Sequence, residues 1–427
     1  MSTSLLAAAQ PAKWVTVWAA SAHGPYPVGN PSAQPNQRFA FPVPADGARD
    51  QTFRLIVRPD VWGPETRLRF SNVFGTRPLE LDDVHVGVQL SGAAIVRGTN
   101  RPVTFHGQPR IVIPAGQDLW SDAVAIGAQA GALDGRKLAV SFHVGAQSGP
   151  MTWHAKALTT SYLTPQGAGR FGSAEEETPF SLTTTSWFFL DAVDMRLPAS
   201  TKVVVAFGDS ITDGTASTLN GDDRWPDVLS RRLHRAYGTR VAVVNAGIGG
   251  NQVAGPATYS AASPIAGGPA AGQRLERDVL SLSGVATVIW LEGINDFGNG
   301  VDASVETVSS AMRAIVARMR ERVPGVTVVG ATVTSALHST NGAHGSAGED
   351  QKRRALNTFI RTSGVFDAVA DFDAATLDPA TGELQAMFVP ESTTGGAGDK
   401  LHPNHAGYMA MAQAIDLTKL GLGAPER

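Results

Sequence analysis

The stretch of sequence that decides the fold is VVVAFGDSITDG, residues 203–214. Its first five residues are apolar and three of them are valines, which predicts a buried strand. The small and polar residues that follow predict a turn into a helix, with Ser210 at the junction. A hydroxyl at that point stands clear of the sheet, and the free N–H groups of the helix start face any negative charge beside it. Ser210 is therefore the candidate nucleophile.

In the second half of the chain, apolar runs typical of strands alternate with helical patterns. Between residues 304 and 323 the apolar positions recur at spacings of three and four, which predicts one helix with a buried stripe. Apolar strands with helices between them indicate a parallel sheet covered on both faces. Ligands bind at the carboxyl ends of such strands, and Ser210, residues 247–250 and Asn295 all follow predicted strands. The predicted strands are residues 203–207, 241–245, 286–291, 326–332 and 368–372.

The first half of the chain has a different period. Residues 137–144 alternate between apolar and polar positions, and similar runs are separated by Gly and Pro turns. Many short strands of this kind predict an antiparallel sandwich or jelly roll. The period changes at the Pro/Ala/Ser stretch of residues 197–200, which is suited to a linker. We therefore expect an all-β domain at residues 14–197 and an α/β domain at residues 198–427.

Composition excludes several classes of function. At 427 residues the chain is too long for one ordinary core. The formal net charge of −3, without a Lys/Arg cluster, predicts no nucleic-acid partner. The absence of cysteine removes disulfides, thiolate catalysis and cysteine-ligated zinc. No apolar run approaches the ~18 residues that span a membrane.

The N-terminal residues 5–10, LLAAAQ, resemble the tail of a secretory signal with a small-residue cleavage site. No basic residue precedes them, and the apolar stretch is shorter than the ~7–15 residues of a signal. A secreted or periplasmic location is the prediction, and a cytoplasmic location stays open.

Four short sequence blocks together resemble those of the GDSL, or SGNH, hydrolases, in the family's order and at plausible distances. Ile211 stands where the name-giving motif has leucine, a change that leaves the nucleophile in place. The resemblance covers roughly residues 201–420 and implies a flavodoxin-like three-layer α/β/α domain that hydrolyses carboxylic esters. The four blocks are GDS at residues 208–210, NAGIGG at 245–250, GIND at 293–296 and DKLHP at 399–403.

Chemistry assigns a base to the candidate nucleophile. An unassisted serine hydroxyl is weak and needs a general base. His402 has a carboxylate three residues upstream, Asp399, which would hold the imidazole in the useful tautomer and stabilise the imidazolium. His85 has Asp82 at the same spacing, but it sits among strand residues of the first half. We therefore expect a catalytic triad of Ser210, Asp399 and His402.

The resemblance also implies the donors that bind the oxyanion. They are the backbone N–H groups of Ser210 and Gly250 and the side-chain amide of Asn295. A glycine at position 250 lets substrate approach the backbone closely. Gly249 is the neighbouring candidate if the register is shifted by one residue.

Other motifs have simpler interpretations. Asp209, Asp213 and Asp296 are expected to be turn and capping carboxylates. His402 and His405 are three residues apart, but no third ligand is evident, so neither a metal nor another cofactor is predicted. Residues 335–348 form a Gly/Ser-rich segment whose histidines, His338 and His344, either rim the pocket or lie in a solvated loop, and we favour the solvated loop. Four tryptophans of the first half, Trp62, Trp120, Trp153 and Trp187, suggest either a sugar-stacking platform or ordinary core, and we favour core.

The predicted function is hydrolysis of carboxylic esters, preferably with short acyl chains, through an acyl-enzyme. The substrate would be a small-molecule or carbohydrate ester, and the oligomeric state stays open. One alternative is a carbohydrate-binding protein with an incidental or inactive hydrolase domain. Another is an acyltransferase that uses the same residues.

Overall fold

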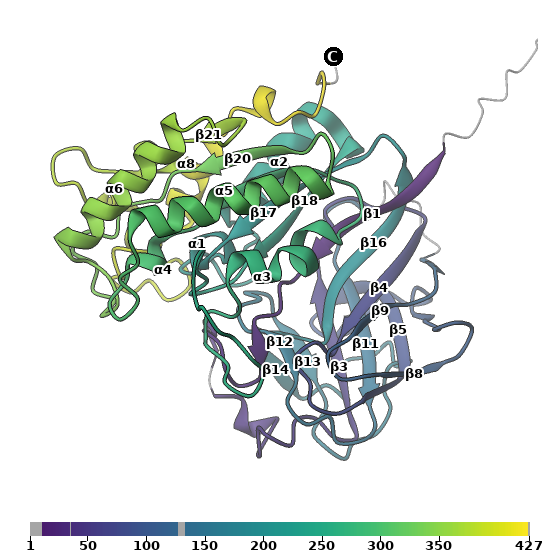
Figure 1. Ribbon diagram of the computed structural model, residues 1–427. Coiled ribbons are helices and arrows are strands. Elements are labelled where there is room, and N and C mark those ends of the chain that lie inside the picture. The colour runs from purple at the N-terminus through teal and green to yellow at the C-terminus, as the bar shows by residue number, and fades with distance from the viewer. Residues whose placement is uncertain (1–10, 35, 127–132, 426–427) are drawn as a thin grey trace, which may run out of the picture.

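The computed structural model describes residues 11–34, 36–126 and 133–425. The strands of residues 12–198 form the lower part of the molecule in Figure 1, and the parallel sheet with its helices forms the upper part. The suggested signal remnant, residues 5–10, lies outside the described residues, so the location stays a prediction. Among the helices of the described ranges, none combines the length and apolar character needed to cross a membrane.

The first half of the chain forms antiparallel sheets, as predicted, and it also contains a short 3₁₀ turn, Gln37–Phe39. Whether these sheets form a sandwich or a jelly roll stays a prediction. One sheet has the order β1 (Ala12–Ala19), β16 (Leu190–Pro198), β4 (Glu65–Ser71) and β10 (Val124–Ala125), with β9 (Asp118–Trp120) also paired to β4. A second sheet has the order β14 (Leu182–Thr184), β13 (Ser161–Leu163), β3 (Gln51–Val57), β11 (Leu138–Val144), β5 (Leu79–Ser91) and β6 (Ala94–Ile95), and β7 (Arg101–Pro102) and β8 (Arg110–Ile113) pair with β5. The third contains β15 (Trp187–Phe188), β12 (Thr152–His154) and β2 (Gly24–Pro25).

The tryptophans of this half are mainly core residues. Trp62, Trp153 and Trp187 are all buried. Trp120 is partly buried, and the guanidinium groups of Arg67 and Arg69 lie over its ring. The packing therefore fits the core interpretation rather than a sugar-stacking platform.

The second half forms a parallel sheet covered by helices on both faces, so the predicted flavodoxin-like three-layer fold is confirmed. In chain order, its strand order is 2-1-3-4-5, and the order reverses on the two sides of the first strand. The sheet consists of β18 (Val241–Gly247), β17 (Lys202–Gly208), β19 (Val285–Leu291), β20 (Thr327–Ala331) and β21 (Ala368–Ala370). The helices are α1 (Ser210–Asp213), α2 (Trp225–Tyr237), α3 (Ala271–Leu275), α4 (Ile294–Phe297), α5 (Val305–Arg322), α6 (Ala347–Thr362), α7 (Phe372–Thr376) and α8 (His405–Gln413).

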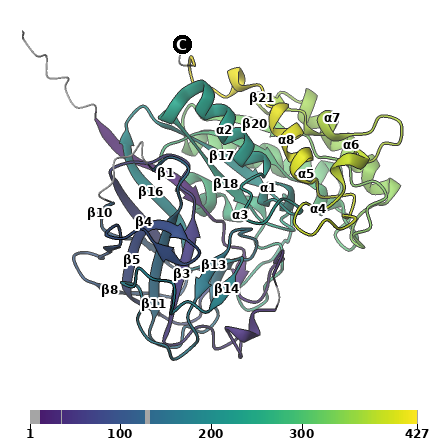
Figure 2. The ribbon, with the colours of Figure 1, turned by 180° about the vertical axis from the view of Figure 1, so that it is seen from behind.

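Two layers of helices enclose the sheet. Apolar side chains of α2 and α8 pack against one face, the side seen in Figure 2. Those of α3, α5 and α6 pack on the opposite face, toward the viewer in Figure 1. Helix α5 follows its predicted range, and Ser304 caps it by accepting the backbone N–H of Thr307. Helix α8 ends at Gln413, and Asp416 caps a separate 3₁₀ turn after it.

The β-rich half covers one edge of the parallel sheet, where β18 lies. Asp60 accepts the backbone N–H of Val243 at 2.6 Å and the hydroxyl of Ser230 in α2 at 2.5 Å. Val15 of β1 and Val244 of β18 belong to one hydrophobic cluster that runs through both halves. The two halves therefore share a core, and the domain boundary at residues 197–198 stays a prediction.

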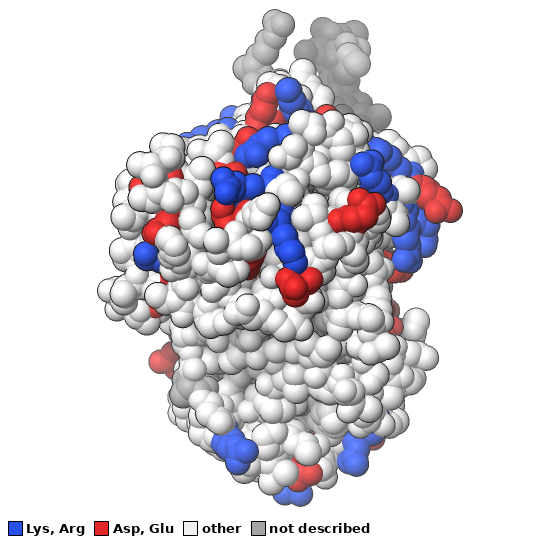
Figure 3. Space-filling model, turned by 60° about the vertical axis from the view of Figure 1, so that its left-hand side comes forward, with Lys and Arg blue, Asp and Glu red and all other residues white. Residues whose placement is uncertain are grey.

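Charged side chains are mixed in sign on the face shown in Figure 3. Over the α/β half, Lys and Arg stand beside Asp and Glu. The lower part of the same face, over the β-rich half, is largely uncharged. This face presents no broad patch of one sign.

Candidate active site

Ser210 stands at the turn between β17 and the short helix α1. The side chain of Asp209 caps this helix by accepting the backbone N–H of Ile211 at 3.0 Å. Gly208 is the last residue of β17 and lies close to β19. A Cβ at this position would lie 2.2 Å from the carbonyl oxygen of Leu291. Glycine at position 208 thus lets β17 run close to β19 up to the point where Ser210 leaves the sheet.

The hydroxyl of Ser210 meets the closing segment of the chain. Its Oγ lies 2.8 Å from Nε2 of His402. On the other side of the ring, Nδ1 of His402 lies 2.6 Å from Oδ2 of Asp399. Oδ1 of Asp399 accepts the backbone N–H groups of Leu401 and His402 at 3.0 and 2.9 Å. Hydroxyl, imidazole and carboxylate therefore form one continuous row of contacts, as a serine nucleophile, a base and an orienting carboxylate require.

The surroundings favour a neutral imidazole beside a carboxylate anion. Burial lowers the pKa of His402, and the charges of Lys156 and His344 act in the same direction against the attraction of Asp399. Burial also opposes the charge on Asp399, but its hydrogen bond to His402 and the backbone donors hold the pKa of Asp399 well below its ordinary value. A neutral ring near pH 7 can accept a proton from the hydroxyl.

A cavity of about 430 Å³ lies beside Ser210. Gly250, Asn295 and His402 line the same cavity. Nδ2 of Asn295 donates to the carbonyl oxygen of Asn251 at 2.9 Å, which orients the amide and leaves its second hydrogen for a ligand. The site residues suggested by the sequence are thus brought around one cavity.

The two candidate glycines differ in their contacts. The N–H of Gly249 donates to Oδ2 of Asp213 at 2.9 Å, so this group is already engaged. The N–H of Gly250 has no acceptor within the described ranges. Gly250 has a φ of 84°, a left-handed conformation that glycine adopts without strain. Gly250 therefore stays the candidate backbone donor beside Ser210.

The β-rich half supplies part of the cavity wall. Asn30, Pro31, Ser32 and Lys156 line the cavity together with residues of the α/β half. Lys156 is buried, and its Nζ donates to Oγ1 of Thr215. Burial lowers the pKa of Lys156, although nearby carboxylates oppose the shift. No motif in the sequence marks these residues, because their position depends on how the two halves pack.

Asp213 has further contacts besides those of the turn or capping carboxylate that we expected. It is buried, and its Oδ1 lies 3.1 Å from Nε2 of His154 in β12. Its other oxygen, Oδ2, accepts the N–H of Gly249. Burial works against its charge, but His154 and Lys156 lower the pKa of Asp213 below its ordinary value. Asp213 therefore connects the β-rich half with the glycine turn of the site.

Part of the chain is similar to known proteins. Residues 206–410 match the GDSL-like lipase/acylhydrolase family. Residues 206–410 are a GDSL-like lipase/acylhydrolase domain. Among solved structures, a carbohydrate acetylesterase from Sinorhizobium meliloti has 15% identity, covering 50% of this chain and 96% of that chain, with a TM-score of 0.38. An aryl esterase from M. smegmatis has 18% identity, covering 50% of this chain and 95% of that chain, also with a TM-score of 0.38. No curated protein sequence matches the chain.

Two other carboxylates of the GDSL-like domain have the expected structural roles. Asp209 caps α1, and Asp296 accepts the backbone N–H groups of Val253 and Ala254 at 2.9 and 2.8 Å. Burial raises the pKa of Asp209 to about 7 and that of Asp296 to about 6. Both side chains hold loops of the hydrolase domain at the sheet edge.

The other histidines singled out in the sequence have different surroundings. His85 lies 3.4 Å from Asp83 in the β-rich half and is not paired with Asp82. His344 lines the cavity of the hydrolase domain, where its Nδ1 lies 2.5 Å from Glu349, so the solvated-loop expectation is wrong for this residue. His338 fits that expectation, because its side chain is largely exposed.

The pair His402 and His405 does not converge. His402 contacts Ser210 and Asp399, whereas Nδ1 of His405 lies 2.9 Å from the hydroxyl of Ser392. Within the described ranges, no group of three or more His, Asp and Glu side chains is placed to hold a metal ion.

Arg274 is a buried arginine that supports the GDSL-like site from beneath. It donates to the carbonyl oxygens of Gly208 and Ala246, both at 2.8 Å, and so joins the ends of β17 and β18. Its Nε donates to Oδ1 of Asn251 at 2.6 Å. Since the carbonyl of Asn251 orients Asn295, Arg274 holds three segments of the site in one frame.

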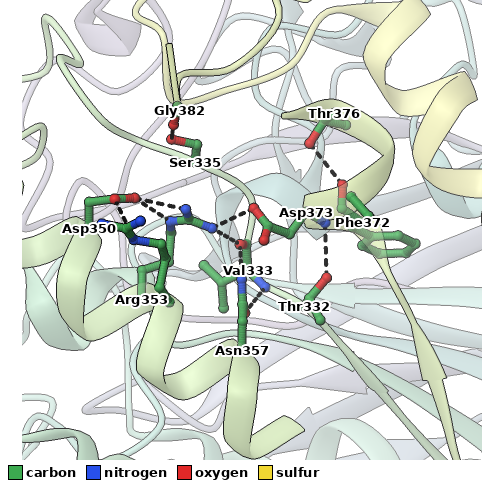
Figure 4. A network of polar contacts seen from close by, with 12 residues as sticks. Thr332, Val333, Ser335, Asp350, Arg353, Asn357, Phe372, Asp373, Thr376 and Gly382 are labelled. Carbon is green, nitrogen blue, oxygen red and sulfur yellow. Dashed lines mark hydrogen bonds and ion pairs between the residues drawn. The ribbon is translucent and has the colours of Figure 1, made fainter. Parts of the chain in front are cut away.

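A second buried arginine supports the loop after β20, which reaches the cavity (Figure 4). Arg353 of α6 donates to Asp350 and to the carbonyl oxygen of Val333 at 2.9 Å, and to Asp373 at 2.5 Å. Asn357, one turn further along α6, accepts the backbone N–H of Val333 at 2.7 Å and donates to its carbonyl at 2.8 Å. Side chains of α6 thus replace strand partners where the chain leaves the sheet.

Proposed function

We propose that the protein hydrolyses carboxylic esters with short acyl chains through an acyl-enzyme on Ser210. The family match supports ester hydrolysis in general. The observation that carries the finer proposal is the row of contacts from Ser210 through His402 to Asp399, with distances of 2.8 and 2.6 Å.

In the first half of the reaction, Oγ of Ser210 attacks the ester carbonyl carbon while Nε2 of His402 takes its proton. The carbonyl electrons move to oxygen and form an oxyanion. Donors from Ser210, Gly250 and Asn295 bind it, and a preorganised donor of this kind contributes about 3–4 kcal/mol to the barrier reduction. Asp399 stabilises the imidazolium that has formed.

The oxyanion then collapses, and the bond between the acyl carbon and the alcohol oxygen breaks. The alcohol leaves with the proton from His402, and the acyl group stays on Ser210. Water then attacks the acyl carbon as His402 removes its proton, and collapse of the second oxyanion expels the serine oxygen. Ser210 regains its proton from His402, and the carboxylic acid is released.

The cavities support a compact and polar substrate. A second cavity of about 340 Å³ adjoins the first, and the two share Ser32, Thr215 and Asp399 in their walls. Leu158 lines the second cavity, whereas Asn30 and Lys156 line the first. Two small spaces meeting beside the nucleophile suit a short acyl group and an alcohol that forms hydrogen bonds, such as a sugar hydroxyl.

The variant Ser210→Ala tests the nucleophile. It should reduce kcat for p-nitrophenyl acetate by at least about 10⁴-fold. It should also abolish labelling by a fluorophosphonate, while the melting temperature stays unchanged. Ser309→Ala is the matched control, because it removes another buried serine hydroxyl, in α5 and outside the walls of both cavities, and should keep both activities. Turnover by Ser210→Ala at a near-normal rate would refute the proposal.

A panel of esters tests the substrate class. We expect kcat/KM to fall as the acyl chain of p-nitrophenyl esters lengthens from acetate to decanoate, because the cavities are small. Acetylated sugars should be hydrolysed and long-chain triglycerides should not. A rate that rises with chain length would reverse the short-acyl proposal. Product analysis with added alcohol separates hydrolysis from acyl transfer.

A further inference from the structure

Residues 248–251 of the glycine block form a tight turn at the cavity. The N–H of Asn251 donates to the carbonyl oxygen of Ile248 at 3.1 Å, which closes a four-residue β-turn. Gly250 is the third residue of this turn, and its φ of 84° is that of a type II turn. The peptide between Gly249 and Gly250 is therefore the central peptide of the turn.

The orientation of that central peptide decides whether Gly250 can serve the reaction. Type I and type II turns differ mainly in the direction of this one peptide, which is reversed between them. In a trans peptide the C=O and N–H bonds point in opposite directions. A reversal would turn the Gly250 N–H away from its position in the type II turn. Glycine tolerates both conformations, so residues 249–250 do not themselves favour one strongly.

A side chain of the β-rich half fixes this orientation. Nδ2 of Asn30 donates to the carbonyl oxygen of Gly249 at 3.0 Å. This oxygen and the Gly250 N–H belong to the same peptide, so holding the one directs the other. Asn30 lies at the exposed rim of the cavity and also lines it.

The preceding peptide is held by a carboxylate of α1 that is itself paired with the β-rich half. Oδ2 of Asp213 accepts the N–H of Gly249 at 2.9 Å, and Oδ1 lies 3.1 Å from Nε2 of His154. The other ring nitrogen of His154 lies 2.8 Å from the carbonyl oxygen of Ser21. Both ring nitrogens face acceptors, which requires the doubly protonated, charged ring. The turn is thus tied to the β-rich half on both sides of Gly249.

We propose that Asn30 is a positioning residue that holds the turn of residues 248–251 with the Gly250 N–H directed at the oxyanion. The β-rich half thereby completes the esterase site, rather than merely covering the sheet edge. This inference rests on the proposed function, because it needs Gly250 as an oxyanion donor. Asn30 itself touches neither the nucleophile nor the base and acts through Gly249.

The test uses the full-length protein and two variants of position 30. Asn30→Ala removes the donor, and Asn30→Asp places an acceptor against the Gly249 carbonyl. We expect kcat for p-nitrophenyl acetate to fall about tenfold in the first and further in the second, with KM changed less than about twofold. Rates are compared on the high-pH plateau, so that the new carboxylate does not act through His402.

A transition-state analogue gives a readout that a merely structural role would not move. A boronic acid forms a tetrahedral adduct on the serine and places an oxygen among the oxyanion donors. The inhibition constant of the boronic acid should rise in the variants by the same factor by which kcat/KM falls. Asn100→Asp is the matched control, because Nδ2 of Asn100 also donates to a glycine carbonyl, that of Gly172, at 3.0 Å within the β-rich half. This control should retain the wild-type rate.

The outcomes separate this inference from the proposed function. If the wild-type protein shows Ser210-dependent turnover and both variants match it, Asn30 has no positioning role. A loss confined to KM, or a loss that the Asn100→Asp control shares, also overturns the inference. If the wild-type protein shows no Ser210-dependent turnover at all, the proposed function itself fails.

Discussion

Lys156 places a positive charge beside the base of the site. Its ammonium group is buried, lies near the carboxylates of Asp213 and Asp399, and shares the cavity wall with His402. Like charges repel most strongly where water is excluded. The charge of Lys156 therefore helps to keep His402 neutral and ready to accept a proton.

A pH–rate profile checks this effect. Because the pKa of His402 lies below its ordinary value of 6.5, the acid limb of kcat/KM should fall below pH 6.5 in the wild-type protein. Lys156→Met removes a charge that lowers this pKa, so the limb should move to higher pH. Lys419→Met, at an exposed position, should leave the limb in place. An unchanged limb in Lys156→Met would contradict the assignment.

Glu292 is a buried carboxyl whose protonation affects stability. Burial raises the pKa of Glu292 from 4.5 to about 8, and its Oε2 accepts the indole N–H of Trp290 at 2.6 Å. A pKa raised by folding gives stability that is complete below the unfolded pKa and is lost as the pH rises through the folded pKa. The folded protein should therefore lose stability between about pH 4.5 and 8 on account of this group.

The variant Glu292→Gln should remove that pH dependence while keeping an acceptor for Trp290. Its free energy of unfolding relative to the wild-type protein should rise between about pH 4.5 and 8, by about 1.4 kcal/mol for each unit of the pKa shift. Urea unfolding at a series of pH values measures the difference. Parallel curves for the two proteins would exclude a titrating Glu292.

Sequence motifs predicted some site residues and could not predict others. Ser210, Asn295 and His402 each stand in a short block with its own composition, and all three line one cavity. Asn30 and Lys156 line the same cavity, but no local pattern surrounds them. Their positions follow from packing between segments more than 50 residues apart, as in the contact of Lys156 with Thr215.

Among the elements, the network of α6 shows how a helix fixes a loop (Figure 4). Arg353 is buried and contacts the carboxylates of both Asp350 and Asp373. Removing Arg353 takes a positively charged partner away from two buried carboxylates. The loss of one partner of a buried ion pair lowers the free energy of unfolding by about 3–5 kcal/mol. The loop after β20 depends on this helix for its hydrogen bonds.

We expect Arg353→Met to lower the free energy of unfolding by about 3–5 kcal/mol in urea denaturation. Arg354→Met is the matched control: the neighbouring arginine also contacts Asp350, at 3.1 Å, but its side chain is 71% exposed. An exposed pair contributes about 0–1 kcal/mol, so this control should change little. Equal effects of the two substitutions would contradict the role of burial.

The periodic elements were predictable and their ends were less so. Helix α5 follows its apolar stripe because Ser304 caps its start. The predicted strand at residues 368–372 is shorter, since Phe372 begins α7 after Asp371 caps it. The residues of β11 alternate between apolar and polar, yet all seven are buried. Segments distant in sequence cover the second face, and alternation carries no information about them.

At the scale of the whole molecule, the two halves share one hydrophobic cluster. Val15 and Val17 of β1 belong to it together with Val205 and Val244 of the parallel sheet. Polar groups also cross the contact, as in the pairing of Arg69 with Ser281 at 2.8 Å. The α/β half therefore depends on the β-rich half for burial as well as for residues of the cavity.

A fragment of residues 198–427 is expected to fail as an esterase. It would expose the part of the cluster that β1 covers and would lack Asn30 and Lys156. We expect it to aggregate or to unfold without cooperativity, and any folded fraction should have kcat/KM reduced by more than about tenfold. Size-exclusion chromatography, thermal melting and the ester assay measure these effects. Coexpression with residues 1–197 is the control, and a monomeric fragment with full activity would contradict the expectation.

The pairing of β1 with β16 bears on how the chain is made. Strand β1 pairs only with residues 192–198 among the strands described, so its partner follows roughly 170 residues later. At about 5–20 residues per second of translation, this amounts to roughly 10–35 s in which the new strand has no neighbour. An unpaired apolar strand can join another chain, and Lys13 within β1 is the kind of charge that discourages such pairing. Slowing or speeding the ribosome over this interval should therefore change the yield of folded protein more than its final stability.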